Sequence, residues 1–139
     1  MILRGKVSYV ISSVVIDADI SFPFGIHVQR RIWLADVPPV QNDEAATKRA
    51  AHCAVILLGG KKIFIDLPDS DNPGRTLATV YRDFEDGIVE AFEPEFQQTL
   101  NIDNRSVKVV NVNKYLKHLS TTNYQVDDVR QRVIPQRVG

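Results

Sequence analysis

The stretch that decides the fold runs from Lys6 to Val40, KVSYVISSVVIDADISFPFGIHVQRRIWLADVPPV. Short bursts of β-branched and aromatic residues fill it, and such bursts are typical of strands. We expect three strands, over 6–16, 20–26 and 30–37, joined by tight turns. The Pro-Phe-Gly sequence between the last two marks a bend, because proline and glycine interrupt strand pairing.

The next segment, NDEAATKRAAHCAVILLGG over 42–60, has the apolar spacing of a helix. Asn42 or Asp43 can cap its start, and Gly59 and Gly60 can end it. Beyond the helix we expect strands over 61–67, 76–83 and 105–112, a loop of breaker residues over 68–75, an aromatic-rich hairpin or excursion over 84–103, and a short amphipathic helix over 113–120.

This order of elements predicts a mainly β protein with α-helices (α+β): a five-stranded OB-fold barrel with two to three helices, whose open face commonly holds oligonucleotides. One domain is expected over 1–120, with an acidic insertion at about 83–104. Residues 121–139 are expected to form a C-terminal tail with a disordered end.

Composition narrows the class of protein. The chain of 139 residues carries 17 basic and 17 acidic side chains, which argues against a histone-like polyanion binder. Residues 83–99 hold acids and no Lys or Arg, so they are a candidate contact for a protein partner, whereas 100–139 is mainly basic. The single cysteine, Cys53, is expected to be a small buried hydrophobe. The N-terminus matches neither a secretory signal nor a membrane span, so a cytoplasmic location without a membrane partner is expected.

Five short motifs then occur in a fixed order: VIDADI (15–20), RIWLADVPP (31–39), LLGGKKI (57–63), GRTLATVY (74–81) and VNVNKYL (110–116). Together, from about Lys6 to Leu119, they resemble the staphylococcal (thermonuclease) nuclease family, which hydrolyses nucleic-acid phosphodiesters with calcium.

The resemblance implies a Ca²⁺ site and a phosphate site. Asp19 and Asp36 match the calcium-ligating aspartates, Asp17 is the usual acidic neighbour, and the family would add the backbone carbonyl of Val37. Arg31 and Arg75 match the two arginines that hold the phosphate. The chemistry agrees, because calcium prefers several hard oxygens and guanidinium groups bind phosphate through paired hydrogen bonds.

The pattern also breaks. Pro39 stands where the family has a glutamate general base, and proline cannot take a proton. Glu44 is a possible substitute base. Asn72 and Pro73 replace a polar-aromatic pair of the family. Tyr124 is a candidate for base stacking, and Trp33 and Phe24 are assigned to the core.

The sequence therefore predicts binding of nucleic acid or nucleotides at a calcium and arginine site, with weak or absent hydrolysis. One alternative is an active calcium-dependent nuclease that cleaves DNA or RNA. Another is a vestigial site on a protein-interaction module.

Overall fold

The computed structural model describes residues 1–41, 43–68 and 75–133. The chain opens with a meander of β1 (Ile2–Val10), β2 (Val15–Phe22) and β3 (Ile26–Leu34). Then come α1 (Glu44–Leu58), β4 (Lys62–Asp66) and β5 (Thr76–Arg82). The remaining elements are the 3₁₀ turns η2 (Glu85–Ala91) and η3 (Pro94–Phe96), a hairpin of β6 (Gln97–Ile102) and β7 (Arg105–Asn111), and the helices α2 (Val112–Thr121) and α3 (Val126–Val133).

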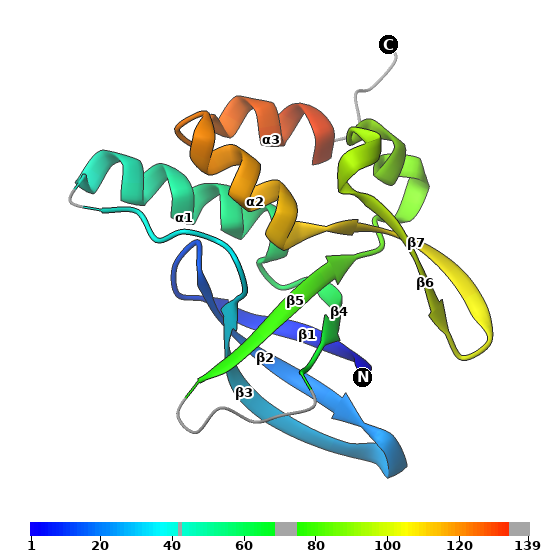
Figure 1. The fold of residues 1–139 in the computed structure, drawn as a ribbon. Helices are drawn as coiled ribbons and strands as arrows, with labels where there is room; N and C mark the ends of the chain where they lie inside the picture. Colours follow the sequence, from blue (N-terminus) through cyan, green and yellow to red (C-terminus); the bar gives the residue numbers. More distant parts are fainter. Residues whose placement is uncertain (42, 69–74, 134–139) are drawn as a thin grey trace.

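Five strands close into a barrel (Figure 1). β1 pairs antiparallel with β2 and β4, β2 pairs with β3, and β4 pairs with β5. A short parallel pairing of β3 with β5 completes the circle, with Ile32 opposite Thr76. The β6–β7 hairpin extends the sheet from β5. This is the OB-like, mainly β fold with helices that the sequence predicts.

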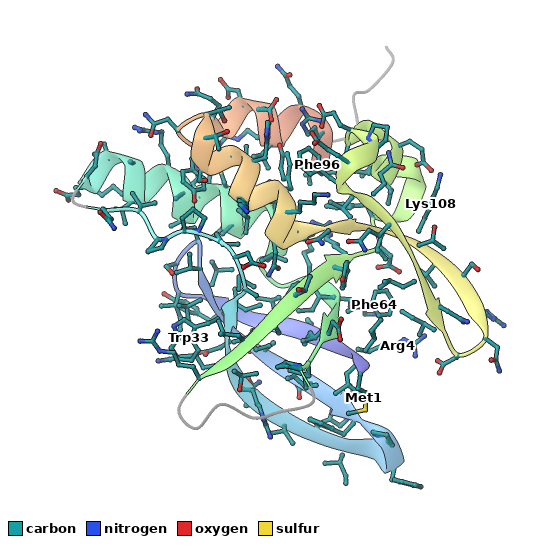
Figure 2. The ribbon with its side chains drawn as sticks, viewed as in Figure 1. Met1, Arg4, Trp33, Phe64, Phe96 and Lys108 are labelled. Atoms are coloured by element: carbon teal, nitrogen blue, oxygen red, sulfur yellow. The ribbon has the colours of Figure 1, made fainter. Side chains whose placement is uncertain are left out.

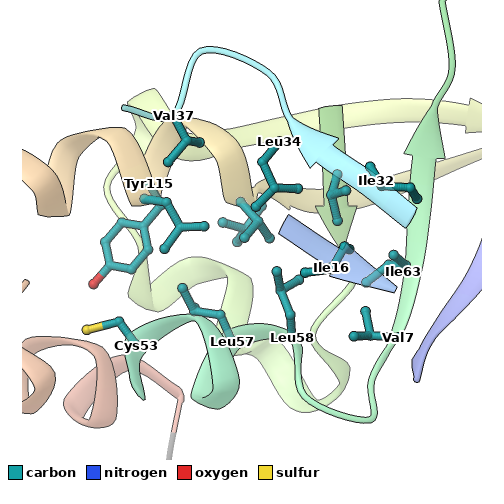
Figure 3. Close-up of a cluster of buried hydrophobic side chains, with 14 of the residues drawn as sticks. Val7, Ile16, Ile32, Leu34, Val37, Cys53, Leu57, Leu58, Ile63 and Tyr115 are labelled. Carbon is teal, nitrogen blue, oxygen red and sulfur yellow. The ribbon is translucent and has the colours of Figure 1, made fainter. Parts of the chain in front are cut away.

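The core lies between the barrel and α1 (Figure 3). Alternation along β2 turns Ile16, Ala18 and Ile20 inward, and all three are fully buried. Leu57 and Cys53 of α1 pack into the same cluster, with Cys53 0 % exposed. The prediction that Cys53 is a buried hydrophobe is confirmed.

The strands of the meander are correct in number and wrong in boundaries. A turn over 11–14 lies inside the first expected strand, and the second expected strand, 20–26, contains the turn between β2 and β3. Apolar residues continue through the first turn, so composition hides it. The Ser12 hydroxyl accepts a hydrogen bond from the backbone N–H of Val14 at 3.1 Å, which is how a serine supports a turn.

Local signals place α1 well. Asp43 is its N-cap, and its carboxylate accepts from the backbone N–H of Ala46 at 3.1 Å. The other expected cap, Asn42, lies outside the described residues, as do Asn72, Pro73 and most of the expected loop 68–75.

The acidic segment is part of the domain. Instead of one hairpin it forms η2, η3 and β6, and its aromatic side chains are buried. Phe92 and Phe96 contact the ring of Tyr115 edge-on, with ring centroids 5.0 Å and 5.2 Å apart. The aromatics therefore anchor this excursion to α2.

The expected C-terminal tail is helical as far as Val133. α3 packs on α1 and η2, and Val129 at its centre is fully buried. Period 3.6 is hard to detect in a helix of 8 residues with one core position, which is why the sequence did not indicate it. The expected disorder of the end falls on residues 134–139, outside the described ranges.

Candidate nucleic-acid interface

The outer surface of β2, β3 and the start of β5 carries half of the predicted site residues: Asp17, Asp19, Arg31 and Arg75. Because the even-numbered residues of β2 point into the barrel, Asp17 and Asp19 both point outward. Arg31 and Trp33 of β3 lie on the same outer side. We call this surface the β2–β3 face; its members are Tyr9, Asp17, Arg31, Trp33, Arg75 and Leu77.

Asp17 and Arg31 face each other across β2 and β3. The Arg31 Nε donates to Asp17 Oδ1 at 3.0 Å, and Nη2 donates to Oδ2 at 3.3 Å. These hydrogen bonds and the charge of Asp17 raise the pKa of Arg31 above its usual value. Both partners are partly exposed, so this is a surface pair that a phosphate can compete for.

Trp33 lies under a second guanidinium. The Arg75 Cζ is 5.7 Å from the centre of the Trp33 ring, a cation–π distance. Thr76 pairs with Ile32, so the parallel register sets Arg75 beside Arg31 on neighbouring strands. Neighbouring strands are about 5 Å apart, so the two guanidinium groups are close enough to bind adjacent phosphate oxygens. Figure 2 shows Trp33 at this edge of the barrel, between the β1–β2 turn and the start of β5.

Tyr9 reaches the same face through a β-bulge. Simple alternation from Val7 would turn Tyr9 inward, but the register of β1 against β2 shifts between these two residues, so Tyr9 pairs with Asp17. The extra residue, Ser8, has its hydroxyl 3.1 Å from the backbone carbonyl oxygen of Asp17 and 3.0 Å from Gln29 Oε1. Tyr9 is therefore 66 % exposed.

The predicted calcium ligands are not brought together. Asp19 is opposite Gln29, near the hairpin end of β3, whereas Asp36 follows the far end of that strand. At about 3.3 Å per residue, the five steps from Gln29 to Leu34 alone span about 17 Å, and calcium ligands lie about 2.3–2.6 Å from the ion. Asp19 lies beside His27 instead, with His27 Nδ1 3.6 Å from Asp19 Oδ2.

Other predicted site residues occupy different places. Val37 is buried, and Asp36 before it is exposed with φ 63°. Glu44 is the exposed first residue of α1 and lies 3.5 Å from Lys48. Tyr124 is 3 % exposed, so its ring faces the interior and offers no surface for a base to stack on.

The sequence did not identify the aromatic residues of the β2–β3 face as exposed. Tyr9 is not among the predicted site residues. Trp33 is predicted to be in the core, but it is only partly buried. Phe24, also assigned to the core, is 99 % exposed at the tip of the β2–β3 hairpin with φ 67°. Strand alternation could have placed Trp33, because Ile32 and Leu34 beside it are typical core residues.

No family model matches the chain, and a search of curated proteins gave no match either. Among the described residues, no helix combines the length and apolar character needed to cross a bilayer. The fold and the side chains of the β2–β3 face therefore carry the functional argument.

Proposed function

We propose that this protein binds single-stranded nucleic acid on the β2–β3 face. The observation that carries the proposal is the ring of Trp33 with Arg75 above it and Arg31 on the adjacent strand position. OB folds bind oligonucleotides on the face of strands 2 and 3, between the loop after strand 1 and the loop before strand 5. Trp33 and Tyr9 can stack on bases, and the two arginines can bind the backbone phosphates.

The site is built for binding rather than hydrolysis. The residue after Val37 and Pro38 is Pro39. Of the two acids that would share a metal, Asp19 on β2 is opposite Gln29, whereas Asp36 lies beyond the end of β3. Among the described residues of this face, no general base and no group of converging carboxylates accompanies the arginines, which can bind a phosphodiester but do not activate water.

The binding test uses the only tryptophan of the chain, Trp33, as a reporter. Titration with an oligothymidylate of about ten nucleotides is expected to quench Trp33 emission, because a base stacks on the indole ring. Arg75→Ala should weaken binding roughly tenfold, and Trp33→Leu roughly ten- to hundredfold by anisotropy of a labelled oligonucleotide. Arg105→Ala, an exposed arginine on β7, is the matched control and should bind normally.

Salt dependence provides a second readout of the same proposal. Two phosphate contacts predict a slope of log K against log salt of about −1.4, since each contact with a single strand contributes about −0.7. Unchanged emission at high oligonucleotide concentration, or equal affinities of wild type and Arg75→Ala, would contradict the proposal.

Calcium is expected to have little effect. Because Asp17 is paired with Arg31, and Asp19 lies far along the strand from Asp36, calcium should change oligonucleotide affinity by less than about twofold. The measurement is the same titration with calcium and with EDTA, together with a cleavage assay on labelled single-stranded DNA. Calcium-dependent cleavage that is lost in Asp36→Asn would instead show that these acids act together.

A further inference from the structure

A pocket with several basic side chains lies on another side of the barrel. It has a volume of about 1010 Å³ and opens between the outer surface of β1 and β4, the end of α1, and the segment that carries Arg82, Asp83, Phe84 and Ile88. It reaches Asp19 on β2 and Val133 at the end of α3. In Figure 2, Arg4 and Phe64, which line it, lie on the opposite side of the barrel from Trp33. Its volume is in the range of small-molecule sites.

The polar lining is mainly basic. The basic side chains are Arg4, Lys6, Lys61, Lys62 and Arg82, and the acidic ones are Asp19 and Asp83. Lys6 is directly opposite Lys62 in the pairing of β1 with β4, and both are exposed. Asp19 is opposite Lys6 on the other side, in β2, so one carboxylate partly offsets this pair of like charges, and an anion between the two lysines would add to that compensation.

Arg82 adds a partly buried cation. Its Nη1 donates to the backbone carbonyl oxygen of Leu57 at 2.6 Å, and its Cζ lies 3.8 Å from the centre of the Phe84 ring. Burial, opposed by the charge of Asp83, lowers the pKa of Arg82 to about 10. At neutral pH the group is still charged, and it offsets the negative end of the α1 dipole, which would otherwise repel an anion.

The walls of the pocket also offer apolar surface. Phe64 and Phe84 line it together with Ile56 and Ile88. Arg4 is fixed beside this surface, because its Cζ lies 5.7 Å from the Phe64 ring and its Nη1 donates to Asp103 Oδ2 at 2.6 Å. The pocket therefore combines a basic side with an apolar side.

We propose that this pocket binds a small phosphorylated ligand of nucleotide size, with its phosphates at Lys6 and Lys62 and its ring against the apolar wall. The lysines have the charge and reach for phosphate oxygens, and the partly exposed side chains of Ile56 and Ile88 can contact a flat ring. The site is distinct from the β2–β3 face and does not depend on the proposed binding of single-stranded nucleic acid.

Calorimetric titration of the full chain with ADP tests the proposal, with adenosine as the uncharged comparison. ADP should bind with a dissociation constant below about 1 mM, and adenosine at least tenfold more weakly. The double variant Lys6→Gln/Lys62→Gln should weaken ADP binding at least tenfold. The matched control is Lys114→Gln/Lys117→Gln, two exposed lysines on α2 with the same change in net charge. Arg75→Ala should bind ADP like wild type, which separates this site from the β2–β3 face.

Three results of the calorimetry would overturn the proposal. They are no heat with ADP at millimolar concentration, equal affinities for ADP and adenosine, and equal losses of ADP affinity in the two double variants. The last result would indicate general charge attraction. A fourth contradicting result is that oligothymidylate displaces ADP and that the Lys6→Gln/Lys62→Gln variant binds oligothymidylate more weakly than wild type. The pocket would then be part of the surface that binds the polynucleotide. Circular dichroism of each variant checks that the fold is retained.

Discussion

Asn113→Ala is expected to lower the free energy of unfolding by about 3–5 kcal/mol. Asn113 is 5 % exposed, and its side chain joins α2 to the barrel. Its Oδ1 accepts from the backbone N–H of Val80 at 2.9 Å, and its Nδ2 donates to the backbone carbonyl oxygens of Ala35 and Ala78, each at 2.9 Å. Alanine would remove a partner from all three backbone groups; the Val80 N–H and the Ala35 carbonyl lose this hydrogen bond, whereas the Ala78 carbonyl keeps one from the Ala35 N–H. Each buried group left without a partner costs about 1–3 kcal/mol.

Urea unfolding followed by Trp33 fluorescence measures this loss. The control is Asn101→Ala on an exposed position of β6, which should change the free energy of unfolding by less than about 0.5 kcal/mol. Equal stabilities of Asn113→Ala and wild type would mean that water or a shifted backbone satisfies the three groups.

Arg132→Met is expected to cost about 2 kcal/mol, after allowance for solvent screening at the partly exposed Glu93. Arg132 attaches α3 to the acidic segment. Its Nη1 and Nη2 donate to the two Glu93 carboxylate oxygens, each at 2.7 Å, and Nη1 donates to the carbonyl oxygen of Ala91 at 3.1 Å. It also contacts Asp128 of the previous helical turn at 3.3 Å. Methionine retains the aliphatic packing and removes only the charge and donors.

The same network predicts a dependence on pH. The hydrogen bond from Arg132 lowers the pKa of Glu93. Burial pushes the pKa of Asp128 upward, but hydrogen bonds from Arg132 and Tyr115 outweigh it, so this pKa is lowered as well. A lowered pKa in the folded state adds stability above the unfolded-state pKa of about 4, and this contribution is lost as pH falls through the folded-state values.

Unfolding free energies measured from pH 7 to pH 2 should therefore fall more steeply in acid for wild type than for Arg132→Met. Arg130→Met, an exposed arginine on the same helix, should keep the wild-type profile. Parallel profiles of wild type and Arg132→Met would show that the pair of acids gains nothing from this guanidinium.

The parts of the fold that the sequence predicts are those with local signals. Asp43 at the start of α1 and the glycines at its end act on neighbouring backbone groups, so they can be read from the chain. The order of strands around one helix likewise predicts the OB-like barrel, because few topologies accommodate it.

The arrangement of the site depends on strand register, which the sequence does not specify locally. The motif VIDADI brings two acids near RIWLAD in the sequence, but pairing sets Asp17 against Arg31 and leaves Asp36 beyond the end of β3. One bulged residue, Ser8, likewise decides that Tyr9 faces solvent. A register shift of one residue moves every side chain of a strand to the other face of the sheet. The face on which Asp17 and Tyr9 lie is therefore set by the packing of the whole barrel.

The buried thiol of Cys53, in the middle of α1, can report local unfolding around this helix. Burial, together with the charge of Asp128, raises the pKa of Cys53 to about 11, so at neutral pH the group is almost wholly in the unreactive protonated form. A maleimide or disulfide reagent can therefore modify the native chain only when α1 separates from the elements packed around the thiol, α2 and α3 among them. Rates of modification across the proposed substitutions would report how often that separation occurs, without any added label.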